Sequence, residues 1–132
     1  MINSLEEIVG KSNGSMALLK ALADNSFDSI LVTDALVESK IIYANKSFGA
    51  LTGYDPVSVI GKNPKILQGA DTDEKVIERL AMALKSGDTF EGKAINYKKD
   101  QTPFIMHWRV IPVKNNQKIM AWVAIQKESS SI

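Results

Sequence analysis

The residues with the clearest capacity for ligand chemistry are side-chain amides and a lysine in the stretch GKNPKILQG at 61–69. Asn63, Lys65 and Gln68 surround two aliphatic residues there. An amide offers both a donor and an acceptor, and a lysine offers a positive charge for an anion. Each residue also has a simpler structural explanation. Asn63 before Pro64 suits an extended turn, Gln68 before a glycine is a common loop ending, and Lys65 suits a solvated charge.

Further amides lie in runs that alternate like strands. Asn96 stands in AINY, where a polar side chain is unusual if it faces a core. Gln126 stands between Ile125 and Lys127, and it faces either the core or solvent. No single one of these amides indicates a ligand site by itself.

The rest of the composition excludes several kinds of chemistry. The chain has no cysteine, so it has no disulfide, thiolate metal site or cysteine nucleophile. His107 is the single histidine, which argues against a His-rich zinc site and a Ser-His-Asp triad. No nucleophile–base pair, metal-ligand cluster or phosphate-cradling glycine loop stands out, and we predict that the chain is not an enzyme.

Length and charge indicate a single domain of ordinary type. The chain has 132 residues, of which 45% are hydrophobic, and its 16 basic and 15 acidic residues give a net charge of +1. No block of Lys or Arg predicts binding to nucleic acid or to an anionic membrane. No run is long enough for a transmembrane helix and no signal sequence opens the chain, so we predict a cytoplasmic location.

The N-terminal part is predicted to be helical. Ser4 and Glu7 resemble a capping box that opens a short helix over Leu5–Val9. Ser15 is a capping residue for a helix that ends at Asp24 and has apolar residues at helical spacing. We expect residues 1–26 to form a helical cap that packs on the following domain or on a partner.

The middle of the chain predicts a hairpin followed by helices. Ser29–Thr33 and Lys40–Ala44 are β-branched, apolar runs separated by a polar turn. Asn45 caps a short helix that ends at Gly53, and Asp55-Pro56 begins another that Gly61 ends. Thr72-Asp73 caps the longest helix, Glu74–Ser86, whose apolar face is formed by Val76, Ile77, Leu80 and Leu84.

The final third alternates as strands over Phe90–Lys98, Pro103–Pro112 and Ile119–Lys127, with turns at 99–102 and 113–118. This order predicts an α+β domain over 27–128, followed by a tail at 129–132. We expect a five-stranded antiparallel sheet, with short helices and one longer helix on one face. A pocket between the helices and the sheet would be the ligand site.

The order of elements and several motifs resemble a PAS domain. NPKILQG resembles NCRFLQG, the signature of the LOV (light-oxygen-voltage) class of flavin-binding PAS photoreceptors. The resemblance covers most of residues 29–127, and its motifs are YANKSFGALTGY at 43–54, GKNPKILQG at 61–69, DTD at 71–73, INYKKD at 95–100, PV at 112–113 and AIQKE at 124–128. It implies a sensory flavoprotein that acts in signal transduction.

The resemblance also implies roles for individual residues. Asn63 and Gln68 would flank the isoalloxazine ring, and Asn96 would hydrogen-bond its pyrimidine edge. Gln126 would lie near the flavin N5 and O4 and relay their state to the outer face of the sheet. Lys65 takes the place of an arginine that pairs with the phosphate. Apolar and aromatic walls are expected from Ile30, Val32, Leu67, Met106, Trp108 and Val110.

The chain departs from the LOV pattern at several positions. Pro64 stands where the family has the cysteine that forms a covalent photo-adduct, so this adduct cannot form. Met106 replaces an asparagine that would bind the pyrimidine edge. Ala81 replaces a second phosphate-binding arginine, and Arg79 nearby lies on a different face of the helix. Gln101 replaces a hairpin glycine.

These departures change the expected strength of flavin binding and the expected signalling mechanism. Burying a polar group of the flavin without a hydrogen-bond partner costs about 1–3 kcal/mol. The contacts to the pyrimidine edge and the phosphate that Met106 and Ala81 do not make therefore predict weakened flavin binding. We expect non-covalent FMN, with FAD as the alternative because the phosphate end is less constrained. Signalling would use photoreduction or a redox change, with Trp108, Trp122 or Tyr97 as electron donors. The simpler role for both tryptophans is packing within the sheet.

A second hypothesis is a PAS interaction module that dimerises and has an empty or lipid-like pocket. Met106 and Ala81 favour it, because each removes an expected flavin contact. Under either hypothesis we expect a homodimer or a partner signalling protein, bound through the N-terminal helix and the sheet face.

Overall fold

The computed structural model describes residues 13–132, so the helix expected over Leu5–Val9 lies outside the described residues. Within this part of the chain, no helix is long and apolar enough to cross a membrane. The elements in chain order are α2 (Asn13–Asp24), β1 (Ser29–Asp34), β2 (Ile41–Ala44), α3 (Lys46–Thr52), the 3₁₀ helices η1 (Pro56–Val59) and η2 (Pro64–Leu67), α4 (Glu74–Ser86), β3 (Phe90–Tyr97), β4 (Pro103–Asn115) and β5 (Lys118–Ser129).

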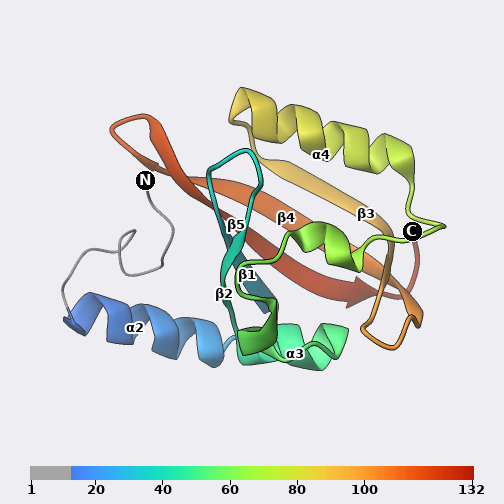
Figure 1. Cartoon of the computed structure of the whole chain (residues 1–132), viewed down its shortest axis with the longest axis horizontal. Coiled ribbons are helices and arrows are strands. Elements are labelled where there is room, and N and C mark those ends of the chain that lie inside the picture. Colours follow the sequence, from blue (N-terminus) through green and yellow to red (C-terminus); the bar gives the residue numbers. More distant parts are fainter. Residues whose placement is uncertain (1–12) are drawn as a thin grey trace.

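The strands form one antiparallel sheet in the order β2-β1-β5-β4-β3, which confirms the predicted α+β fold (Figure 1). The last strand lies between the first hairpin and the second, because β5 pairs with both β1 and β4. Rows of paired residues therefore cross the centre of the sheet. One such row is Ser29, Gln126 and Trp108, and the next residues on the same face are Leu31, Ala124 and Val110.

The two faces of the sheet are covered by different helices. The segment from α3 to α4 covers one face, and the main core lies between them, with Phe48, Leu31 and Val59 almost fully buried. Helix α2 packs on the opposite face, where Met16 and Leu19 contact a small cluster around Val32 and Ala121. The hydroxyl of Tyr43 donates to Asp24 at the end of α2 over 2.9 Å.

Local capping explains where α3 and α4 begin and end, as the sequence predicted. The predicted cap Ser15 is wrong, because α2 begins at Asn13 and Ser15 lies within it. Asn45 Oδ1 accepts from the Phe48 backbone N–H at 3.0 Å, and Asp73 Oδ1 accepts from that of Lys75 at 2.9 Å. Gly53 and Gly87 follow α3 and α4 with φ of 79° and 77°, the left-handed conformation that glycine adopts at little cost.

The β4–β5 connection is shorter than the predicted turn over 113–118. Strand β4 continues to Asn115 and β5 begins at Lys118, so only Asn116 and Gln117 connect them. Both have positive φ, 51° and 68°, as a two-residue hairpin turn requires. The polar residues that suggested a loop instead pair across the strands, because an exposed end of a hairpin tolerates them.

Candidate functional site

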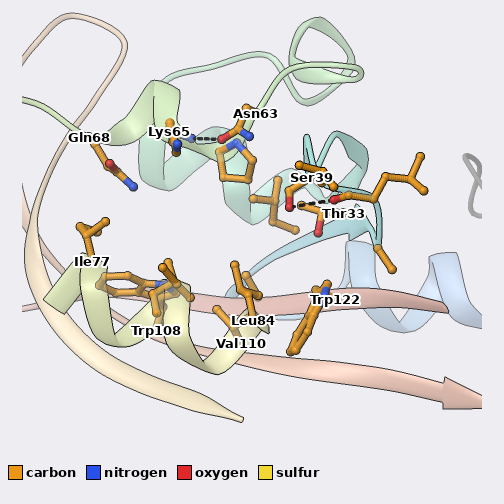
Figure 2. Close-up of a pocket in the computed structure, with 18 of the residues that line it drawn as sticks. Thr33, Ser39, Asn63, Lys65, Gln68, Ile77, Leu84, Trp108, Val110 and Trp122 are labelled. Atoms are coloured by element: carbon orange, nitrogen blue, oxygen red, sulfur yellow. Dashed lines mark hydrogen bonds between the residues drawn. The ribbon is translucent and has the colours of Figure 1, made fainter. Parts of the chain in front are cut away.

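A cavity of about 550 Å³ lies between the sheet and the segment from η2 to α4 (Figure 2). This volume is within the range of sites for small organic ligands. The sheet contributes residues of β1, β4 and β5, and the opposite side comes from the η2 turn and α4. The lining residues are Leu31, Thr33, Ala35, Leu36, Val37, Ser39, Asn63, Pro64, Lys65, Gln68, Ile77, Leu80, Ala81, Leu84, Lys85, Trp108, Val110, Trp122, Ala124 and Gln126.

The stretch 61–69 forms a capped 3₁₀ turn at the cavity. Asn63 Oδ1 accepts from the Lys65 N–H at 2.8 Å, and Pro64 occupies the first helical position, where no N–H is needed. Asn63 Nδ2 donates to the Glu38 carbonyl and so joins this turn to the β1–β2 loop. Both ends of the Asn63 amide are therefore engaged with the chain, and one N–H of Nδ2 remains for a further contact.

The loop after η2 is attached to the edge strand β3, and this attachment positions Gln68. Thr72 Oγ1 donates to the Ile95 carbonyl at 2.7 Å and accepts from the Gly69 N–H at 3.0 Å. Gly69 lies against the ring of Tyr97, and a Cβ at this position would clash with that ring. Gln68 is half-buried, and its side chain extends into the cavity, whereas Tyr97 is absent from the cavity wall.

Gln126 lies on the opposite wall, in the middle of the sheet. Its Oε1 accepts from the Ser29 hydroxyl at 2.9 Å, and its side chain is only 4% exposed. The remaining amide atom has no hydrogen-bond partner within residues 13–132 and is available to a ligand in the cavity. Trp108 is paired with Gln126 across β4 and β5, and Trp122 lines the cavity farther along β5.

Helix α4 contacts both the cavity and the core. Ile77, Leu80 and Leu84 line the cavity, and Val76, Leu80, Ala83 and Leu84 pack against the core. No residue of this helix is buried, although its apolar face is turned toward the protein. Bound ligand would therefore bury apolar surface that α4 leaves open, at about 25 cal/mol per Å².

The structure brings together six of the sequence-predicted site residues and separates the others. Asn63, Lys65, Gln68, Trp108, Val110 and Gln126 line the cavity. Leu67, Asn96 and Met106 are buried on the same side of the sheet, but they do not line it. Met106 is 1% exposed within the core, and the Asn96 Nδ2 makes only a 3.4 Å contact with the Ala94 carbonyl.

The expectation that Val32 forms a cavity wall is wrong. Val32 and Ile30 lie on the opposite face of β1, in the cluster that packs against α2. Leu31 and Thr33 line the cavity in their place. The reason is the two-residue period of a strand, which turns alternate side chains to opposite faces.

The sequence did not predict the part of the cavity wall that the β1–β2 loop forms, nor the contribution of Lys85. Leu36, Val37 and Ser39 come from the β1–β2 loop, which carried no motif. Lys85 follows the apolar face of α4 and lines the cavity with Lys65. The pairing of Ser29 with Gln126 sets the face of β1 that carries Leu31 and Thr33 toward the cavity, but a single sequence does not reveal this strand register.

Among the described residues, no cluster of three or more His, Cys, Asp or Glu could hold a metal ion.

Comparison with known proteins agrees with this fold. The family model described as PAS domain matches residues 28–131. Phototropin-2 of Oryza sativa subsp. japonica is 36% identical over 114 residues, which are 85% of this chain and 13% of that protein. A blue-light photoreceptor of Listeria monocytogenes is 31% identical over 111 residues, which are 84% of this chain and 44% of that protein. The chain thus spans less than half the length of these relatives.

Solved structures give the same result. The LOV domain of a blue-light activated histidine kinase from Erythrobacter litoralis EL346 has a TM-score of 0.73 and 33% identity, covering 76% of this chain and 94% of that one. A light-oxygen-voltage domain studied with a flavin analogue has a TM-score of 0.79 and 28% identity, covering 86% and 85%. The fold is that of a sensory, signal-transducing domain. This chain belongs to the PAS domain family, in its LOV class of photoreceptor domains.

Proposed function

We propose that this domain binds a flavin non-covalently in the cavity, FMN in preference to FAD, and signals by photoreduction or redox change. The observation that carries the proposal is the composition of the cavity. It combines the Gln68 amide and the Nε2 of Gln126, whose Oε1 is bonded to Ser29, with the indoles of Trp108 and Trp122. Pro64 lines the same cavity, and the chain contains no thiol that could bond to a ligand.

The cavity residues fit a planar heterocycle with one polar edge. When bound, a flavin supplies blue-light absorption and electron-transfer chemistry. The amides of Gln68 and Gln126 would pair with its polar atoms, and Leu80 and Leu84 would exclude water from its face. Trp108 and Trp122 line the cavity and would serve as electron donors, whereas Tyr97 lies outside it.

A hydrogen-bonded route connects Gln126 with helix α2. Ser29 holds the Gln126 amide, and the next residue, Ile30, donates its N–H to Asn45 Oδ1 at 2.8 Å. Asn45 Nδ2 in turn donates to the Ala23 carbonyl near the end of α2 at 2.6 Å. We propose that reorientation of Gln126 is transmitted along this route to α2 and to the sheet face that α2 covers.

The outer surface of α2 is the proposed contact with a second copy or a signalling partner. Leu18 and Leu22 are spaced by one helical turn, and they are 62% and 65% exposed. Exposed apolar residues in one stripe suit a protein contact. The cytoplasmic location and the division into a cap at 1–26, a domain at 27–128 and a tail remain predictions.

The absorption spectrum of the purified protein tests the flavin proposal. We expect a flavin band after purification or after addition of FMN, and loss of this band under blue light with an electron donor. Trp108→Phe with Trp122→Phe should slow this light-dependent loss while flavin remains bound. Protein that acquires no chromophore from either FMN or FAD would contradict the proposal.

The second candidate function is dimerisation with the cavity free of flavin. Met106 favours it, because the LOV pattern has at this position an asparagine that binds the flavin edge, whereas the thioether here is buried in the core and does not line the cavity. Analytical ultracentrifugation would show a dimer whose affinity is the same in light, in darkness, with reductant and with added flavin. A dimer that Leu18→Glu dissociates, and that light or flavin leaves unchanged, would favour this function over the first.

A further inference from the structure

We propose that Lys85, together with Lys65, binds the phosphate of the flavin, and that Lys85 replaces from the next helical turn the cation that Ala81 lacks. This inference rests on the proposed flavin binding and adds a residue that selects phosphorylated flavins. It follows from the charge of the cavity, from the geometry of α4 and from the engagement of Arg79 elsewhere.

The charge of the cavity favours an anion. Lys65 and Lys85 are the charged residues among those that line it, and no carboxylate accompanies them. Neither lysine forms an ion pair within residues 13–132, where Lys40 pairs with Glu38 and where Glu91 pairs with His107 and Arg109. Two cations around an apolar cavity without a counter-charge leave a site that a phosphate would neutralise.

The geometry of α4 places Lys85 and Ala81 on one face. They are four residues apart, so their side chains are neighbours along the helix, and both line the cavity. Side chains on a helix lean toward its N-terminus, and therefore Lys85 leans toward the space above Ala81. The methyl group of Ala81 leaves that space open, and the flexible stem of a lysine can fill it.

The nearest other cation on α4 is directed elsewhere. The Arg79 guanidinium lies over the Phe90 ring, 5.2 Å from its centroid, and its Nη1 donates to the Glu91 carbonyl at 3.4 Å. Arg79 does not line the cavity. Lys85 is therefore the cation of α4 that faces the ligand.

A purely structural role for Lys85 predicts a different result. Lys85 lies in the last turn of α4, where a positive charge also stabilises the helix dipole. That effect changes the stability of the protein but does not distinguish riboflavin from FMN. The two flavins share the ring and differ by one phosphate, so their affinity ratio isolates the phosphate contact.

The experiment measures Kd for riboflavin, FMN and FAD by flavin fluorescence, at low and at high salt. The wild type should bind FMN more tightly than riboflavin, and added salt should reduce this preference. Lys85→Gln should weaken FMN binding about tenfold and leave riboflavin binding unchanged. Lys85→Arg should keep the preference, and Lys75→Gln, on the same helix outside the cavity, should have no effect.

The outcomes separate this inference from the proposed function. Equal weakening of riboflavin and FMN in Lys85→Gln, or no weakening of any flavin, would overturn the role of Lys85 while flavin binding stands. A loss confined to FAD would also overturn the role of Lys85, because FMN carries the phosphate that this lysine is proposed to bind. Absence of riboflavin, FMN and FAD binding by the wild type would instead overturn the proposed function. Urea unfolding without flavin confirms that each variant is folded.

Discussion

The Ser29 hydroxyl donates a hydrogen bond of 2.9 Å to Gln126 Oε1, and both side chains are buried, that of Gln126 at the wall of the cavity. The two residues are separated by most of the chain and are brought together by the antiparallel register of β1 and β5. Because a hydroxyl can donate or accept, Ser29 can bond to either end of the Gln126 amide. It can therefore hold Gln126 in both orientations that a change in the ligand would select.

Replacement of Ser29 should destabilise the domain. Ser29→Ala leaves Gln126 Oε1 without its partner in a buried place, and this should lower the free energy of unfolding by about 1–2 kcal/mol. Urea denaturation followed by tryptophan fluorescence measures the change. Ser130→Ala, an exposed serine near the C-terminal end, is the matched control and should have almost no effect. Equal stability of the two variants would mean that the Ser29 bond makes no net contribution.

Replacement of Asn45 should have a larger effect, because this fully buried amide joins several elements. Its Oδ1 accepts from Ile30 and Phe48, and its Nδ2 donates to Ala23 and Asp28. Asn45→Ala should lower the free energy of unfolding by about 3 kcal/mol or more.

Asn25→Ala is the control for Asn45, since the exposed Asn25 side chain makes one hydrogen bond, to Ala21. Hydrogen exchange in α2 should increase in Asn45→Ala if Asn45 holds the end of this helix. If Asn45→Ala lowers the free energy of unfolding by no more than Asn25→Ala does, the proposed role of Asn45 is contradicted.

Replacement of Gln101 should stabilise the domain. Gln101 adopts φ of 73° in the β3–β4 hairpin, a conformation that glycine tolerates far better than residues with a Cβ. Gln101→Gly should therefore raise the free energy of unfolding by about 0.5–1 kcal/mol. Gln101→Ala keeps the strain and should give no gain. A gain of equal size from alanine would show that the glutamine side chain, and not φ, is unfavourable.

A cysteine at position 64 tests the proposed position of the flavin. Pro64 lines the cavity at the start of η2, and its ring is not required there for any hydrogen bond. In the flavin-loaded Pro64→Cys variant, blue light should bleach the flavin absorption reversibly, because this change restores the cysteine of the LOV signature that Pro64 replaces. Pro64→Ser should bind flavin without that bleaching. Bound flavin in Pro64→Cys that blue light leaves unbleached would place the ring away from Pro64.

The Glu91 carboxylate should make stability depend on pH. The hydrogen bond from His107, together with the nearby charge of Arg109, holds the pKa of Glu91 below its ordinary value. A lowered pKa in the folded state means stability that is present above the ordinary pKa and is lost as the pH falls through the folded value. Thermal unfolding of wild type and Glu91→Gln should therefore differ slightly near neutral pH and converge toward about pH 3. A difference that persists unchanged at low pH would contradict this assignment.

Much of the fold was readable from local signals in the sequence. Asn45 and Asp73 cap their helices as predicted, and the apolar spacing on Glu74–Ser86 gave α4 its bounds. Capping and apolar spacing depend on residues a few positions apart, and a single sequence contains that information. The motif at 61–69 implied a ligand site only through its resemblance to the LOV signature, and Gln68, Lys65 and Pro64 line the cavity.

The tertiary structure decided which side chains meet. The sequence alone established that no thiol adduct can form, because the chain has no cysteine, but it did not reveal which face of β1 lines the cavity. That choice depends on the pairing of Ser29 with Gln126, which put Leu31 and Thr33 inside and Val32 outside. It was also the packing of α4 over the sheet that brought Lys85 to the cavity that Lys65 lines. Register and helix placement depend on contacts between distant parts of the chain, and local patterns leave them undetermined.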